Sequence, residues 1–92
     1  MISLTVSGGS GSVSFDFGNA SFNGASIVSP DSTPMYDFRI TDSDGHLQMG
    51  AVAIDSQKCV IKEFFVLIGV CTITISGAVD DGIYTIKLQA TP

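Results

Sequence analysis

The chain has 92 residues, of which 45% are hydrophobic and 14% are charged, and this composition disfavours intrinsic disorder. A chain of this length holds one hydrophobic core rather than two, so we expect a single domain over residues 1–92. Nine acidic residues oppose four basic ones for a net charge of −5, and the basic residues do not cluster. This balance argues against nucleic acid as a partner, because phosphate neutralisation needs several Lys or Arg side chains in one patch.

Apolar and polar residues alternate with a period of two along most of the chain, and no segment carries an apolar stripe at helical spacing. The alternation predicts short strands, separated by turn residues, at 2–7, 13–17, 27–28, 36–41, 47–54, 59–68, 71–76 and 84–90. The adjacent charges of Lys62 and Glu63 interrupt the sixth of these segments. We therefore expect an all-β fold, a compact antiparallel β-sandwich or small barrel of about seven or eight short strands.

Glycine-containing pairs of residues mark the expected turns. Gly18-Asn19 and Asn23-Gly24 are turn dipeptides, and Asn-Gly favours the positive φ angles of a two-residue hairpin. Asp44-Gly45 predicts the clearest hairpin, with residues 47–54 as its return strand. Gly69 is a further candidate for a hairpin turn.

Residues of the same parity within a strand point to the same face of a sheet, and this predicts the core. The predicted core residues are Leu4, Val6, Phe15, Phe17, Phe38, Ile40, Ile73, Ile75, Tyr84, Ile86 and Leu88.

Cysteine usage and the apolar runs indicate the compartment. A bridge between Cys59 and Cys71 would need a turn near Phe65, inside an apolar run without turn chemistry, so we expect two buried free thiols and a reducing compartment. The first five residues lack both a basic region and an uninterrupted apolar region, so we expect no secretory signal. The longest apolar run, residues 64–71, is well short of the roughly 20 residues of a membrane helix.

Asp80-Asp81-Gly82-Ile83-Tyr84 matches D-x-G-x-Y and resembles the tyrosine corner of immunoglobulin-type domains. The resemblance implies that the Tyr84 ring packs inward and that its hydroxyl bonds back to the backbone. The sequence departs from that family because Ile86 stands in place of the second cysteine and Trp is absent. The resemblance supports a sandwich-like turn rather than membership of the antibody family, and the alternative is a generic Asp-Gly turn before the last strand.

Asp42-Ser43-Asp44-Gly45 resembles the opening of a calcium loop, where oxygen ligands alternate along the chain. No third oxygen ligand follows soon after, and the only Glu is Glu63, so we expect a hairpin turn and no metal site. His46, the only histidine, lies beside that turn, where nothing would fix its ring for catalysis. We therefore expect a protein without cofactor that is not an enzyme.

Residues 64–70 carry more apolar surface than a two-layer fold needs, because a sandwich buries only one face of each strand. Phe64, Val66 and Ile68 would face one side of a strand, opposite to their neighbours at 65 and 67. We expect a subunit or partner protein to cover the second face, with a long loop of the same chain as the alternative. The predicted interface consists of Phe64, Phe65, Val66, Leu67, Ile68 and Val70.

A Ser/Thr/Gly-rich, weakly charged β-domain with a strand that is apolar on both faces is similar in style to the small decoration (cement), neck or tail proteins of bacteriophage virions. That resemblance extends over the whole chain without a diagnostic motif. It implies a non-catalytic structural protein that assembles with copies of itself or with a virion lattice, after synthesis in the host cytoplasm. The alternative is an immunoglobulin-like or carbohydrate-binding module of a larger extracellular protein, but Tyr36 and Tyr84 fall at core-facing positions and leave no platform for sugar stacking.

Overall fold

The computed structural model describes residues 1–92 and contains seven antiparallel strands and no helix. The strands are β1 (Ile2–Val6), β2 (Gly11–Val28), β3 (Tyr36–Thr41), β4 (Leu47–Ile54), β5 (Lys58–Ile61), β6 (Phe65–Ser76) and β7 (Gly82–Ala90). The prediction of an all-β fold is confirmed. The break at Lys62 and Glu63 is also confirmed, since it separates β5 from β6.

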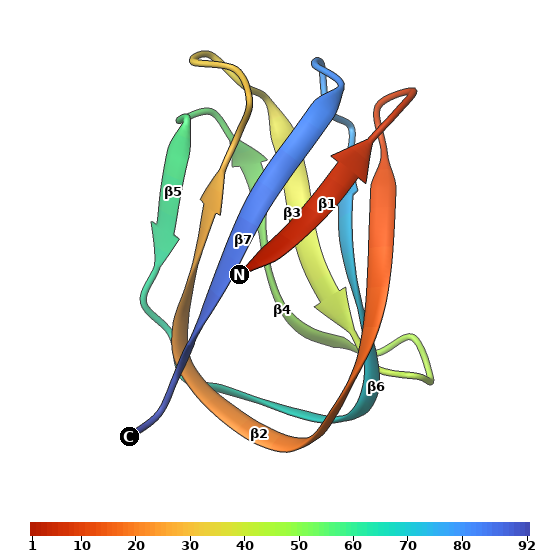
Figure 1. The fold of residues 1–92 in the computed structure, drawn as a ribbon, viewed down its shortest axis with the longest axis vertical. Helices are drawn as coiled ribbons and strands as arrows, with labels where there is room; N and C mark the ends of the chain where they lie inside the picture. The colour runs from red at the N-terminus through yellow and green to blue at the C-terminus, as the bar shows by residue number, and fades with distance from the viewer.

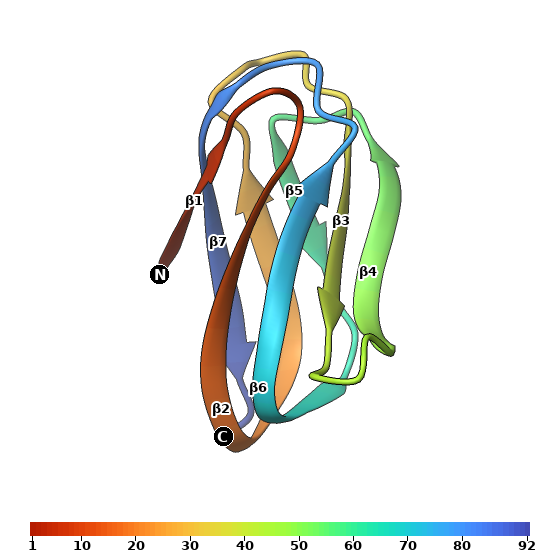
Figure 2. The ribbon, with the colours of Figure 1, turned by 90° about the vertical axis from the view of Figure 1, so that its right-hand side faces the viewer.

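Hydrogen bonds connect the strands in the order β1-β7-β2-β6-β3-β4, and β5 pairs with β2. The long strand β2 belongs to two layers, because residues 11–22 pair with β6 whereas residues 22–28 pair with β7 and β5. Figure 1 shows β2 crossing the bottom of the molecule from one layer to the other, and Figure 2 shows the layers from the side. The sheet does not close on itself, so the fold is sandwich-like and the barrel alternative is wrong.

Strands β2 and β6 turn this corner together through an irregularity in their pairing. Asp16 lies opposite Val70 and Asn19 lies opposite Ile68, so β2 has one more residue between these pairs than β6. Such a bulge bends a strand pair and increases its twist. At the bend Gly18 and a glycine of β6, Gly69, have positive φ angles of 65° and 69°, which cost a glycine little.

The hairpin turns predicted at three glycines are therefore wrong. Gly18-Asn19 and Asn23-Gly24 lie inside β2, and Gly69 lies inside β6. Glycine permits a bulge as readily as a turn, and only the pairing with a distant strand decides between them. The hairpin at Asp44-Gly45 is confirmed, and its return strand β4 has the predicted bounds.

Most of the predicted core is confirmed. Eight of its eleven members are buried, namely Leu4, Val6, Phe38, Ile40, Ile73, Ile75, Tyr84 and Ile86. Phe17 and Leu88 are partly buried and pack against this core. Phe15 is 40% exposed, because this part of β2 pairs with β6 on one side only and leaves the rim of its layer open.

The tyrosine corner implied by D-x-G-x-Y is present. The Tyr84 hydroxyl donates a hydrogen bond of 2.9 Å to the backbone carbonyl of Asp80, four residues upstream. Its buried ring meets the Tyr36 ring edge-on at a centroid distance of 5.0 Å. The Tyr36 hydroxyl is buried as well but has no hydrogen-bond partner.

Candidate interaction surface

A two-stranded ribbon closes one end of the sandwich. It consists of residues 16–22 of β2 and residues 65–70 of β6, which pair across the corner at the bottom of Figure 1. One face of the ribbon points into the molecule and the other points away from it.

The inner face of the ribbon is part of the core. Phe65 and Leu67 are buried, and the Phe65 ring stacks on Phe22 of the opposite strand with centroids 5.2 Å apart. Phe22 in turn meets Phe17 edge-on at 6.1 Å. These aromatic contacts hold the ribbon in one position against the two layers.

The outer face of the ribbon is apolar along β6. We call Val66, Ile68 and Val70, together with Phe64 immediately before β6, the corner patch. Ile68 is 67% exposed, Phe64 64% and Val70 49%, and Val66 is half-buried. The residues of β2 opposite Val70, Ile68 and Val66 are polar, namely Asp16, Asn19 and Ser21. An apolar patch with a polar margin is typical of a protein interaction site.

The predicted interface residues thus fall into two groups. Phe65 and Leu67 lie in the core of their own chain, so their place in the predicted interface is wrong. The physical reason is the alternation of side chains along a strand, which turns these two inward whenever their neighbours face out. The other four residues form the corner patch, and their contact with a partner stays a prediction.

A bulge protects part of the exposed edge at β4. Tyr36 pairs with Ile54 and Phe38 with Ala51, so β4 has an extra residue opposite Asp37. Ala53 has a φ of 52° there, and its backbone N–H donates to the Asp37 carboxylate at 2.9 Å. Bulges of this kind keep an edge strand from pairing with another chain.

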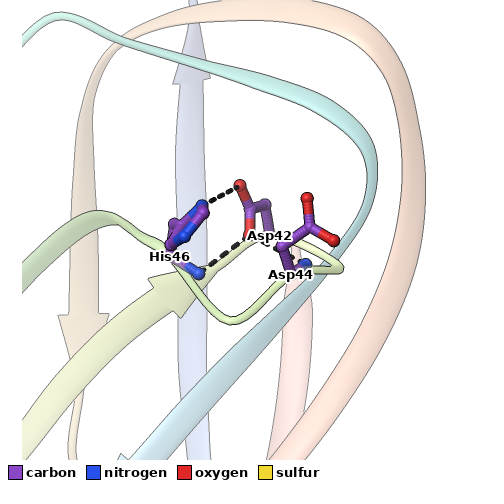
Figure 3. Close-up of side chains that lie close together, drawn as sticks. All are labelled: Asp42, Asp44 and His46. Atoms are coloured by element: carbon purple, nitrogen blue, oxygen red, sulfur yellow. Dashed lines mark hydrogen bonds and ion pairs between the residues drawn. The ribbon is translucent and has the colours of Figure 1, made fainter.

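The β3–β4 turn is a hairpin capped by a carboxylate, as Figure 3 shows. One Asp42 carboxylate oxygen accepts hydrogen bonds from the backbone N–H groups of Asp44 and His46, at 3.0 and 2.8 Å. The other oxygen accepts from the Gln48 amide at 3.2 Å and lies 3.7 Å from His46 Nδ1. Three possible ligand groups approach one another here, but the Asp42 oxygens already serve to shape the turn.

The two thiols are not activated. Cys71 is buried on β6 and Cys59 is half-buried on β5, and both are free. Burial raises the pKa of both thiols above the ordinary value of cysteine. Each thiol therefore stays protonated at neutral pH, whereas a nucleophilic cysteine needs a lowered pKa.

A shallow groove on the outer surface of β7, β2 and β5 gathers three of the four basic residues, although the sequence predicts that they do not cluster. Lys58, Lys62 and Lys87 line it together with Ser26 and Gln89, and its volume is about 280 Å³. We call this the lysine groove. The expectation fails because residues 58 and 87 are distant in sequence yet lie on the two strands that flank β2.

No protein-family model matches the chain, and no curated protein matches it in sequence. The structure contains no helix long and apolar enough to cross a membrane.

Proposed function

We propose that this chain is a non-catalytic structural protein that assembles through the corner patch, with copies of itself or with a larger lattice. The observation that supports this proposal is the exposure of Ile68 and Phe64, although Phe65 and Leu67 beside them are packed in the core. Covering a large apolar side chain contributes roughly 1.5–3 kcal/mol, so a partner on this patch gains several kcal/mol.

Two further features favour this route of assembly. The aromatic stack beneath the ribbon fixes the corner patch before binding, which lowers the entropic cost of association. The bulge at Ala53 disfavours the competing route, in which two copies would pair along β4.

The chemistry of the remaining side chains supports a role other than catalysis. Cys59 and Cys71 are protonated at neutral pH, and His46 is exposed at a turn with Asp42 as its contact. A catalytic site needs a nucleophile or base held by an orienting group, and these residues do not form such an arrangement.

The setting that we propose is a bacteriophage virion, as a capsid decoration or head–tail structural protein made in the host cytoplasm. Its support is the Ser/Thr/Gly-rich, weakly charged composition together with the corner patch. The alternative, an extracellular carbohydrate-binding module, has less support because Tyr36 and Tyr84 are both fully buried. Sugar recognition by stacking needs aromatic faces that are open to solvent.

The test introduces one charge into the corner patch. Ile68→Asp should weaken association by at least ~100-fold, because a buried and unpaired carboxylate costs several kcal/mol. The matched control is Thr74→Asp, which places the same charge on the outer face of the other half of β6 and should assemble like the wild type. Sedimentation velocity over a concentration series gives the mass, and circular dichroism checks the fold.

Two results would overturn the proposal. The first is a wild-type protein that stays monomeric at high concentration and has no affinity for any particle with which it is isolated. The second is an Ile68→Asp variant that remains folded and assembles as the wild type does.

A further inference from the structure

The lysine groove holds positive charge that the chain itself does not neutralise. No Lys or Arg forms an ion pair with a carboxylate, since the only pair in the structure joins His46 to Asp42. Lys87 of β7 lies opposite Ser26 of the central strand β2, and Lys58 of β5 lies opposite Val28, two residues further along β2. Asn23 and Gln89 add neutral hydrogen-bonding groups, and Val60 and Ile61 of β5 add apolar surface. This surface is suited to carboxylates of a partner.

The opposite charge gathers on two loops at one end of the molecule. We call Asp31, in the β2–β3 loop, together with Asp80 and Asp81, in the β6–β7 loop, the acidic loops. Figure 1 shows both loops at the end away from the corner patch. The Asp81 carboxylate accepts the backbone N–H groups of Gly8 and Gly9, each at 3.2 Å, which fixes the loop to the β1–β2 turn.

The carboxylates of the acidic loops are crowded. The proximity of the Asp31 and Asp80 carboxyl groups, which can share a proton, lowers the pKa of Asp31 and raises the pKa of Asp80. No basic side chain of the same chain pairs with either residue. A cation supplied from outside the chain would relieve the repulsion between them.

We propose that the lysine groove of one copy receives the acidic loops of a second copy. The argument is charge complementarity, because one chain of net charge −5 presents three lysines on one surface and three carboxylates on another, and neither set is neutralised internally. A groove of about 280 Å³ accommodates a few side chains, which matches the size of loop tips rather than of a whole face.

The two contacting surfaces differ, so the contact is heterologous and repeats head to tail into a ring or a filament. This inference rests on the proposed function, since it requires that copies assemble. It adds a second contact that is polar and separate from the corner patch. Because its charges are near solvent, assembly through it weakens as the salt concentration rises.

The experiment is a charge swap between two variants. Lys87→Glu reverses a charge in the groove, and Asp80→Lys reverses one on the acidic loops. Each variant alone should associate at least ~10-fold more weakly than the wild type, as measured by sedimentation velocity. An equimolar mixture of the two should recover wild-type association to within ~3-fold, because every contact in an alternating array then joins opposite charges.

Matched controls make the same change in net charge elsewhere. Arg39→Glu alters the outer face of β3 and Asp44→Lys alters the β3–β4 turn, and both should assemble as the wild type does. The milder variants Lys87→Gln and Asp80→Asn should show smaller losses in the same direction, and they serve if a reversal unfolds the chain.

The outcomes separate this inference from the proposed function. If the wild type assembles and Ile68→Asp disrupts it, but the charge reversals have no effect, only the head-to-tail contact is overturned. Failure of the mixture to recover association also overturns it, because the groove then takes a different acidic surface. If the wild type never assembles, both the proposed function and this inference fail.

Discussion

The two halves of β6 share an inward face and differ on the outward face. The inward side chains are buried along the whole strand, at Phe65, Leu67, Cys71, Ile73 and Ile75. The outward side chains change in kind at the bend: Val66, Ile68 and Val70 precede Thr72, Thr74 and Ser76.

The polar half of β6 presents hydroxyl side chains on its outward face. The hydroxyl groups of Thr72 and of Ser14 on β2 form a cross-strand hydrogen bond of 2.8 Å on a surface that is open to solvent. The apolar half has the same inward packing, so its outward Ile68 and Val70 are not required to complete the core. The difference supports the proposal that these side chains serve a contact outside the chain.

We expect the largest loss of stability from truncating buried side chains, and comparing the two halves of β6 tests whether their inward faces are equivalent. Leu67→Ala and Ile73→Ala each remove a fully buried aliphatic side chain, one from each half of β6. We expect each to lower the free energy of unfolding by about 2–5 kcal/mol in chemical denaturation. A loss at Ile73 without a comparable loss at Leu67 would show that the ribbon is not part of the core.

The two buried tyrosines give the next effect. Tyr84→Phe removes the hydrogen bond to the Asp80 carbonyl and should cost about 1–2 kcal/mol in the free energy of unfolding. Tyr36→Phe is the matched control, because its hydroxyl is buried without a partner, and its removal should be neutral or slightly stabilising. Equal losses in both variants, measured by denaturation, would contradict the assigned tyrosine corner.

We expect the smallest effect on stability when the outward side chains of the two halves of β6 are exchanged. Ile68→Thr gives the apolar half of β6 the chemistry of the polar half, and the free energy of unfolding of the monomer should change by less than about 0.5 kcal/mol. Association should nevertheless weaken in a sedimentation experiment. The reverse exchange, Thr74→Ile, should leave the association constant of the corner patch unchanged. A large loss of stability in Ile68→Thr would place Ile68 in the core instead.

Strict alternation made part of this fold predictable. Residues 36–41 and 71–76 carry one unbroken pattern each, and the structure has strands at both. The same alternation separates Phe65 and Leu67 from the outward residues of the ribbon. In such segments the face to which a side chain points depends only on its position along the strand, so it can be predicted from the sequence.

Features that depend on pairing between distant segments were not predictable. A glycine such as Gly18 is typical of a turn. In the structure it lies at a bend within one long strand, because it and Gly69 of β6 lie at the same bulge in the pairing of β2 with β6. The lysine groove was not predictable for the same reason, because Lys58 and Lys87 lie near each other only when β5 and β7 both pair with β2. Side-chain parity predicts that both lysines point outward, but only the strand order predicts that they lie on the same surface.

The proposed cover of the corner patch by a partner can be observed by methyl NMR. A soluble paramagnetic agent added to dilute and to concentrated protein reports the solvent exposure of the Ile68 and Thr74 methyl groups. We predict that concentration strongly reduces the paramagnetic relaxation of the Ile68 methyls and leaves that of Thr74 unchanged. Equal exposure of Ile68 in dilute and assembled protein would contradict the claim.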